Sequence, residues 1–201
     1  MLFISPGHPD RFDPLLARLV SLFASDGADV VIGTEADNLI RPHRAGDPGD
    51  LPWIVEVEGV PNLLHELLHA LQAGGLAIDH GIDYRLIPFD TEVPAQRLLL
   101  WQELTCCTIS CAYLADRPAQ IQPWFNEQTG ILHHFYGHDS AAPFLAHVDI
   151  LLARHPGELE AVVGLGYRLA EERLGSPPAR LEFEALWKAM QACGSDPIFG
   201  A

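Results

Sequence analysis

The residues best suited to chemistry are His65, Glu66 and His69, which form an HExxH motif. Positions i and i+4 of a helix share one face, so His65 and His69 can present two imidazole nitrogens to a single metal ion. Glu66 directly follows the first histidine. In zinc hydrolases with this motif, that carboxylate is the general base for a water molecule that the metal activates. The motif therefore predicts a site for one divalent metal ion, iron or zinc.

The sequence around the motif predicts a helix that is largely buried. Pro61 suits a first helical turn, and Gly74-Gly75 suit a helix end. Leucines fill most positions in between, and burying two histidines and a glutamate among them is costly unless these polar groups have partners. A metal ion would be such a partner. The alternative is that the polar residues only form hydrogen bonds within the core or face solvent.

A catalytic zinc or iron site needs a third protein ligand and an open coordination position. Glu103 is the preferred third ligand, because a carboxylate in its apolar segment needs a positively charged partner. A glutamate ligand from the next helix after HExxH is the arrangement of gluzincin metallopeptidases. Asp79 is the alternative third ligand. In a purely structural interpretation, Glu103 is exposed or forms an ion pair with Arg97.

Several other polar residues compete for roles at the site. Asp79, His80 and Asp83 follow the motif closely and could also bind a metal ion. Glu66 and Tyr84 are the predicted catalytic residues, and the hydrogen-bond donor to an oxyanion could be Tyr84, His80 or a residue of 133–138. The remaining histidines lack a spacing as specific as HExxH, and we expect surface or supporting roles for them: His133, His134, His138 and His147.

Length and charge limit the classes of function. A chain of 201 residues with 48% apolar content fits a single catalytic domain, residues 1–201. The net charge of −15 repels phosphate backbones, so we expect no nucleic-acid ligand. The same charge suits a basic protein or peptide substrate, although solubility alone also explains it.

The sequence also predicts where the protein acts. The chain has no apolar run of membrane-spanning length, and its first residues lack the pattern of a signal peptide. We therefore expect a cytoplasmic protein without membrane partners. The cysteines do not form a secreted disulfide framework and are predicted to be small buried thiols: Cys106, Cys107, Cys111 and Cys193.

Periodicity predicts a mostly helical α+β fold. Besides the motif helix, helices are expected at 13–24, 94–115, 140–154, 157–174 and 179–192. Strands are expected at 29–33 and 53–58, with a loop at 41–52 and a strand or extended connector at 84–89. Residues 94–115 are apolar on nearly all sides, which is typical of a buried central helix. We therefore expect the HExxH helix and this long helix to pack with a small sheet of two or three strands.

The elements that accompany the motif are Ala73-Gly74, then Asp79-x-Gly81-x-x-Tyr84, then Glu103 on an apolar segment. Over residues 13–115 the chain thereby resembles the elongation factor P hydroxylase family of bacteria. It departs from that family at Ala70, where the family has tryptophan, and at Gly75-Leu76, where it has a basic pair. Around the Asp-x-Gly element, the family's aromatic residues are replaced by His80, Ile82 and Asp83.

Two enzymatic interpretations follow, along with one that is not enzymatic. The resemblance implies a non-haem iron enzyme that hydroxylates a protein side chain such as lysine, with His65, His69 and one carboxylate as ligands. The alternative is an intracellular zinc peptidase of gluzincin type, with Glu66 as general base. A metal-binding interaction domain without catalysis is the third interpretation. Glu66 argues against it, because a purely structural site needs no base beside its ligand.

Overall fold

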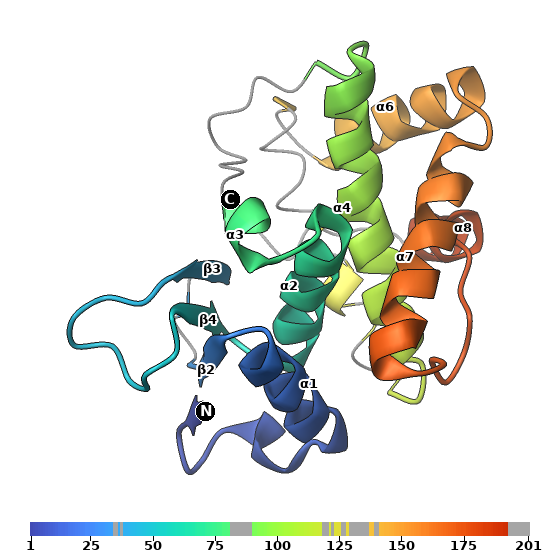
Figure 1. The fold of residues 1–201 in the computed structure, drawn as a ribbon. Coiled ribbons are helices and arrows are strands. Elements are labelled where there is room, and N and C mark those ends of the chain that lie inside the picture. Colours follow the sequence, from blue (N-terminus) through green and yellow to red (C-terminus); the bar gives the residue numbers. More distant parts are fainter. Residues whose placement is uncertain are drawn as a thin grey trace. The chain divides into compact units, whose positions relative to one another are not determined.

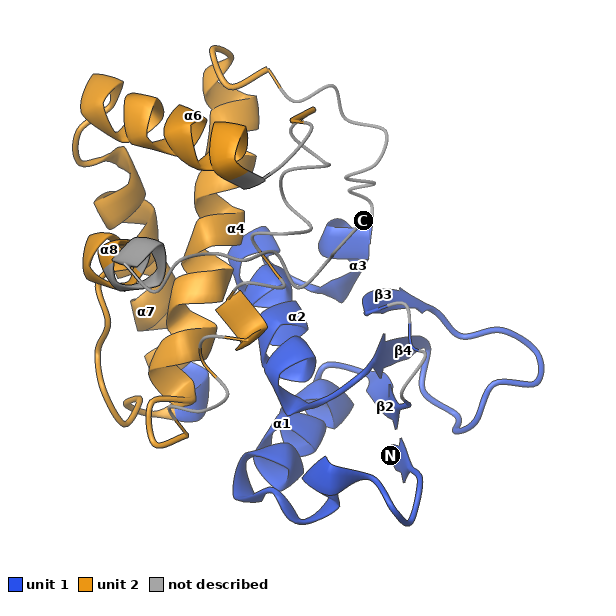
Figure 2. Ribbon diagram, turned by 180° about the vertical axis from the view of Figure 1, so that it is seen from behind, with its two compact units in different colours: residues 1–82, 172–174 blue, residues 83–171, 175–201 orange. Residues whose placement is uncertain are grey.

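A computed structural model describes residues 1–33, 36, 38–80, 90–117, 121, 123–125, 128, 137–138 and 141–192. The chain divides into two compact units, which Figure 2 shows in different colours. The first comprises residues 1–82 and 172–174, and the second comprises residues 83–171 and 175–201. The predicted α+β, mostly helical fold is confirmed. That the whole chain forms a single catalytic domain stays a prediction.

The first unit contains a four-stranded sheet with the strand order β1-β2-β4-β3. Its central strands β2 (Ala28–Ile32) and β4 (Trp53–Val57) are parallel and correspond to the two predicted strands. At the edges, β1 (Leu2–Ile4) runs parallel to β2, and β3 (Leu39–Pro42) runs antiparallel to β4. The two edge strands enlarge the predicted sheet of two or three strands, and β3 takes up the start of the predicted loop 41–52.

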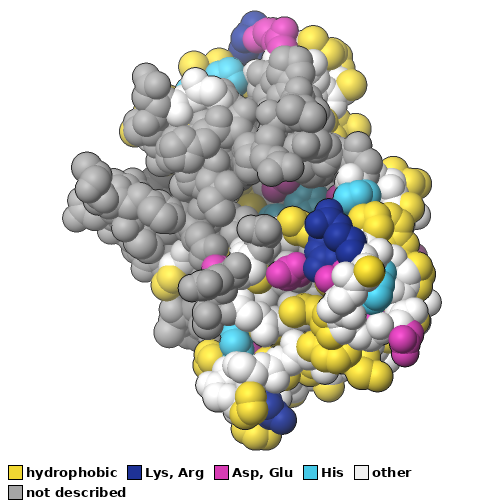
Figure 3. Space-filling model, turned by 90° about the vertical axis from the view of Figure 1, so that its left-hand side faces the viewer, with side chains coloured by type: hydrophobic (Ala, Val, Ile, Leu, Met, Phe, Trp, Pro, Cys, Tyr) yellow, Lys and Arg dark blue, Asp and Glu magenta, His cyan; other side chains and the backbone are white. Residues whose placement is uncertain are grey.

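The connection between β3 and β4 is held by charged side chains. Arg41 on β3 forms ion pairs with Asp47 in this connection and with Glu56 on β4. On the face drawn in Figure 3, basic side chains of the described residues likewise lie beside acidic ones near the top and in the middle of the view, whereas a basic group at the lower edge lies among hydrophobic and uncharged atoms.

The described part of the first unit also contains one 3₁₀ turn and three helices of residues 1–82: η1 (Pro9–Phe12), α1 (Pro14–Ser25), α2 (Val60–Ala73) and α3 (Leu76–His80). The carboxylate of Asp13 accepts a hydrogen bond from the Leu15 N–H at 2.8 Å and caps α1, with Pro14 at its first position. Helix α1 packs against β2, and α2 packs against β4 and α1, as Figure 1 shows. The apolar faces of α1 and α2 thus form the core beside the sheet.

The start of α2 is anchored by η1. The Val60 N–H donates to the Asp10 carboxylate at 2.8 Å, which places a negative charge at the positive end of the helix dipole. Nearby, His8 Nε2 lies 3.0 Å from the Glu58 carbonyl oxygen. Gly59 makes this close approach possible, because a Cβ atom there would lie 2.7 Å from Asp10 Oδ2. The entry of the motif helix is therefore fixed by residues some fifty positions earlier in the chain.

Gly59→Ala is expected to lower the free energy of unfolding by about 1–3 kcal/mol, because the added methyl group must displace the capping carboxylate of Asp10. Urea unfolding followed by circular dichroism measures this change. Gly7→Ala is the matched control, since a Cβ atom at Gly7 would meet nothing within 4 Å. Equal losses of stability in the two variants would contradict this account of Gly59.

The second unit is helical in its described part, with α4 (Pro94–Tyr113), α6 (Ala141–Arg154), α8 (Phe183–Ala192) and α7 (Glu158–Leu174), of which residues 172–174 are counted with the first unit. These helices confirm the four predicted after the motif, although α8 begins at Phe183 rather than at 179. Among the described helices of the protein, none has both the length and the hydropathy that a membrane span requires.

Helix α4 is buried along most of its length, as its sequence predicts. The side chains of Cys106, Cys107 and Cys111 are buried thiols on this helix, and burial raises the pKa of Cys111 to about 12. Close helix packing contributes to this burial: a Cβ atom at Gly166 of α7 would lie 2.6 Å from Thr105 Cγ2. Cys193 and the predicted strand or connector at 84–89 lie outside the described residues.

Candidate metal centre

Helix α2 positions the two histidines of the motif on one face. The opposite face carries buried leucines, including Leu63, Leu64 and Leu67. His65 and His69 are themselves only 6% and 7% exposed, so both imidazoles are shielded from bulk water. The predicted helix and the predicted pairing of its histidines are thus both present in the structure.

The two imidazoles face one another through their Nε2 atoms. These nitrogens lie 2.9 Å apart, and the ring planes meet at 70° with centroids 4.6 Å apart. Two nitrogens that bind one metal ion at about 2.0–2.1 Å each lie roughly 3 Å apart, so the pair fits a metal ion with little rearrangement. The same distance suits an N–H···N hydrogen bond, in which one imidazole donates a proton that metal binding would displace.

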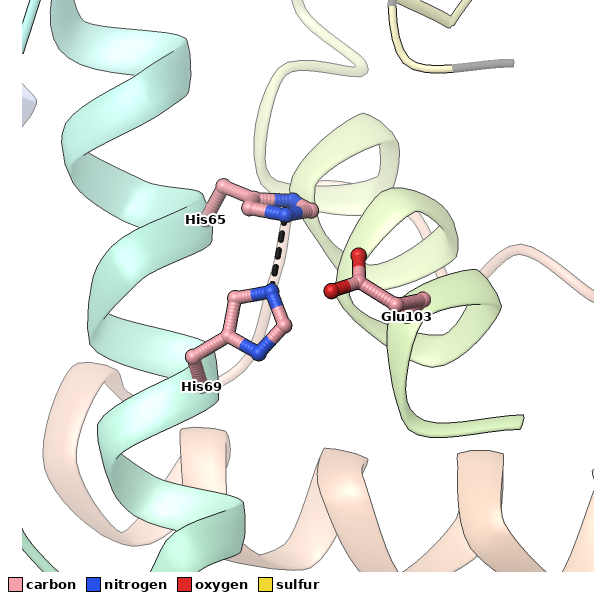
Figure 4. A group of neighbouring side chains, drawn as sticks. All are labelled: His65, His69 and Glu103. Carbon is pink, nitrogen blue, oxygen red and sulfur yellow. Dashed lines mark hydrogen bonds between the residues drawn. The ribbon is translucent and has the colours of Figure 1, made fainter. Parts of the chain in front are cut away.

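Glu103 supplies a potential carboxylate ligand from α4. One ligand atom each from His65, His69 and Glu103 form a group in which all separations are within 4.8 Å, and Figure 4 shows the carboxylate directed toward the two rings. The donor set is two neutral imidazoles and one anionic oxygen, which suits a divalent transition metal. This His-His-Glu group could therefore hold a metal ion.

Arg97 does not form the ion pair with Glu103 that a purely structural interpretation proposed. Its guanidinium instead donates to the Glu158 carboxylate through Nε at 2.8 Å and Nη2 at 3.1 Å. Its Nη1 donates to the Thr91 carbonyl oxygen at 2.8 Å. Arg97 and Glu103 are six positions apart on α4, which puts their side chains on different faces of the helix.

The same ion pair is expected to add a modest pH dependence to the stability of the second unit. Hydrogen bonds from Arg97 and from the Trp101 indole lower the pKa of Glu158 from 4.5 to about 2. A lowered pKa means that the stabilisation is complete above pH 4.5 and is lost as the pH falls toward 2. The Glu158 side chain is 41% exposed, so solvent screening keeps the effect modest.

Glu158→Gln is therefore expected to lower the midpoint of thermal unfolding at pH 7, and the difference from the wild type should shrink between pH 4.5 and 3. Melting curves measured across this range check the prediction. Glu160→Gln on the same helix removes an equal charge without this partner and should leave a smaller difference from the wild type. A Glu158→Gln difference that stays constant down to pH 3 would contradict the assignment.

Asp79 and His80 lie on α3, close to the histidine pair and to the sheet. Asp79 Oδ1 lies 4.0 Å from Nδ1 of His69, on the side of the ring away from Nε2. His80 Nδ1 lies 2.9 Å from the Ile40 carbonyl oxygen, and its ring packs edge-on against Trp53 with centroids 5.5 Å apart. His80 thus contacts the sheet, and Asp79 contacts a ring that carries a candidate ligand atom.

The structure describes three of the remaining residues that the sequence predicts for the site: Glu66, His138 and His147. Glu66 is partly exposed on α2, next to the candidate ligand His65. In the second unit, the rings of His138 and His147 lie 5.3 Å apart, and His147 Nε2 lies 2.8 Å from Thr91 Oγ1. Burial lowers the pKa of His147. Four predicted residues lie outside the described part of the chain: Asp83, Tyr84, His133 and His134.

Two features of the site have no signal in the HExxH pattern. The anchoring of α2 by Asp10 joins residues that are distant in sequence, and no local motif marks it. The approach of Asp79 to His69 depends on how sharply the chain turns after α2, which Gly74-Gly75 indicate only in part.

Comparison with known proteins finds no relative of this chain. No family model matches the chain, and no curated protein or solved structure is significantly similar to it.

Proposed function

We propose that the protein is a metal-dependent enzyme in which His65, His69 and Glu103 hold one divalent metal ion. The observation that carries this proposal is the buried histidine pair, with its Nε2 atoms 2.9 Å apart on one helix. The Glu103 carboxylate, within 4.8 Å of both ligand atoms, supports a third coordination position. Three protein ligands leave room for a substrate, as catalytic sites require.

More specifically, we propose a non-haem iron hydroxylase that acts on a protein side chain such as lysine. Two histidines and one carboxylate are the ligand set of non-haem Fe(II) oxygenases. Ferrous iron, when bound, would supply the oxygen chemistry that hydroxylates a C–H bond. The resemblance of residues 13–115 to elongation factor P hydroxylases points the same way, and a net charge of −15 would favour a basic substrate.

In this proposal the chain's own residues hold charge and protons in place. His65 and His69 would present neutral imidazoles, and Glu103 would offset part of the metal's positive charge. Glu66, the sequence neighbour of His65, is the proposed proton acceptor beside the metal, as the corresponding glutamate is in HExxH hydrolases. Tyr84 is the proposed hydrogen-bond donor to the substrate.

An intracellular zinc peptidase is the second candidate, and the presence of Glu66 next to a ligand favours it. Zinc, when bound, would supply Lewis acidity toward a peptide carbonyl. Glu66 would then take a proton from the attacking water, and Tyr84 would donate to the developing oxyanion. A metal-binding interaction domain without catalysis is the remaining candidate.

Metal analysis of protein purified without added metal, combined with assays, separates these functions. Iron together with oxygen-dependent hydroxylation of a lysine-containing protein supports the hydroxylase. Zinc together with chelator-sensitive cleavage of a peptide supports the peptidase. If the protein binds metal but shows neither activity in assays whose substrates include basic proteins, the result supports the interaction domain.

Glu103→Gln is expected to weaken metal binding about a hundredfold, because one ligand of a zinc site contributes roughly 3 kcal/mol of the apparent binding free energy. Competition with a chromophoric chelator measures the dissociation constant. Glu160→Gln makes the same change of charge on α7 and should leave the constant unchanged. An unchanged dissociation constant in Glu103→Gln would mean that the third ligand is a residue other than Glu103.

A further inference from the structure

The chain reverses direction sharply after the motif helix. Gly74 adopts the left-handed conformation with φ at 89°, and its N–H donates to the Ala70 carbonyl oxygen at 3.0 Å. Gly75 has φ at 149°, and its N–H reaches the same oxygen at 2.8 Å. Residues other than glycine rarely adopt these backbone conformations. The two glycines therefore start α3 beside the last turn of α2, within the same compact unit.

This reversal brings Asp79 to the outer nitrogen of His69. The carboxylate Oδ1 lies 4.0 Å from His69 Nδ1, and the two side chains are 9% and 8% exposed. The other ring nitrogen, Nε2, is the one directed at His65. Asp79 therefore lies on the side of the imidazole opposite the candidate metal position.

We propose that Asp79 is a positioning residue for His69, which it holds through a hydrogen bond accepted from Nδ1–H. This inference rests on the proposed function, in which His69 is a metal ligand. A neutral imidazole carries its proton on only one nitrogen, and a carboxylate beside Nδ1 keeps the proton there. The Nε2 lone pair is then free to bind a metal ion, in a correctly oriented ring.

The separation of 4.0 Å is about 1 Å longer than a hydrogen bond, so a small rotation of either side chain closes it. Hydrogen bonds at catalytic sites are often long without their ligand and shorten when it binds. A ligand role for Asp79 requires a much larger change, because its carboxylate would have to pass to the Nε2 side of the ring. The geometry therefore favours the supporting role over the alternative in which Asp79 is the third ligand.

The test measures the dissociation constants of Zn²⁺ and Co²⁺ for the full-length wild type, Asp79→Ala and Asp79→Asn, by chelator competition. Asp79→Ala is expected to weaken binding about 10–100-fold, the usual effect of losing such a partner. Asp79→Asn should recover most of this loss, because its amide oxygen still accepts from Nδ1–H. The visible spectrum of bound Co²⁺ should keep its shape in Asp79→Asn, since the ligands are unchanged.

Asp29→Asn is the control for general destabilisation. The Asp29 carboxylate is buried in the same unit and accepts hydrogen bonds from the Asp50 and Leu51 N–H groups at 2.9 and 3.0 Å. This variant should unfold at a lower urea concentration and keep the wild-type metal affinity. If it weakens binding as much as Asp79→Ala does, the effect of Asp79 is only structural and the inference fails.

The remaining outcomes separate the inference from the function on which it rests. A wild type that binds neither ion contradicts the metal site itself. If the wild type binds and Asp79→Ala binds equally well, the site stands and the positioning role is wrong. If both Asp79 variants lose affinity by more than about a thousandfold and change the Co²⁺ spectrum, Asp79 is a direct ligand and the inference is overturned.

Discussion

Replacing both His65 and His69 with alanine is expected to raise the dissociation constant for a divalent metal by about four orders of magnitude. Each imidazole ligand contributes roughly 3 kcal/mol to the apparent binding free energy, and the double variant removes two of the three proposed ligands. The remaining carboxylate alone would hold a metal ion no better than an exposed surface glutamate. Chelator competition and elemental analysis of the purified variant measure the loss.

The control for this variant is His43→Ala. His43 Nε2 lies 3.1 Å from the Gly49 carbonyl oxygen in the connection between β3 and β4, so its ring has a structural contact in the same unit. Its replacement should leave metal content at the wild-type level. Circular dichroism should show that the double histidine variant keeps its helices. A folded double variant with full metal content would rule out the HExxH pair as the binding site.

Glu66→Gln is expected to keep the metal ion and lose about 10²–10⁴-fold in turnover. Glu66 follows a proposed ligand in the sequence but is not one of the three proposed ligands, so removing its charge should change metal affinity little. Its proposed role is to accept a proton in the reaction, and general bases contribute an acceleration of this size. The measurement is kcat on whichever substrate the metal analysis identifies, with metal content determined on the same sample.

The nearby exposed acid Glu58 offers a matched substitution, because Glu58→Gln removes the same charge just before α2 begins. It should leave both turnover and metal content close to those of the wild type. Turnover in Glu66→Gln within a few fold of the wild type would contradict the base role. Loss of the metal ion in that variant would instead place Glu66 among the ligands.

The helices whose ends and apolar faces are visible in the local sequence could be predicted from it. The HExxH helix has Pro61 in its first turn, glycines at its end and a leucine face between them, and it begins and ends as predicted. The long buried helix α4 is equally clear, since it is apolar on nearly all sides. The edge strands β1 and β3 were not predicted, because three or four residues are too few to show a two-residue alternation.

The candidate site likewise includes some contacts that the sequence predicts and others that it does not. His65 and His69 come together through helical spacing alone, so the sequence predicts the pair directly. Glu103 could be proposed only because a carboxylate in an apolar helix needs a partner. Asp79 lies on the Nδ1 side of the His69 ring because of the backbone angles of the turn at Gly74 and Gly75. The sequence does not provide these angles. The anchoring of α2 by Asp10 is likewise a contact between distant residues.

The metal content and coordination of the wild-type protein test the central claim most directly. Elemental analysis combined with X-ray absorption spectroscopy at the edge of the metal found would give the stoichiometry and the ligand atoms. We predict one metal ion per chain, with two imidazole nitrogens and oxygen ligands at about 2.0–2.2 Å. A protein that takes up no metal, or a metal bound by sulfur, would contradict the site formed by His65, His69 and Glu103.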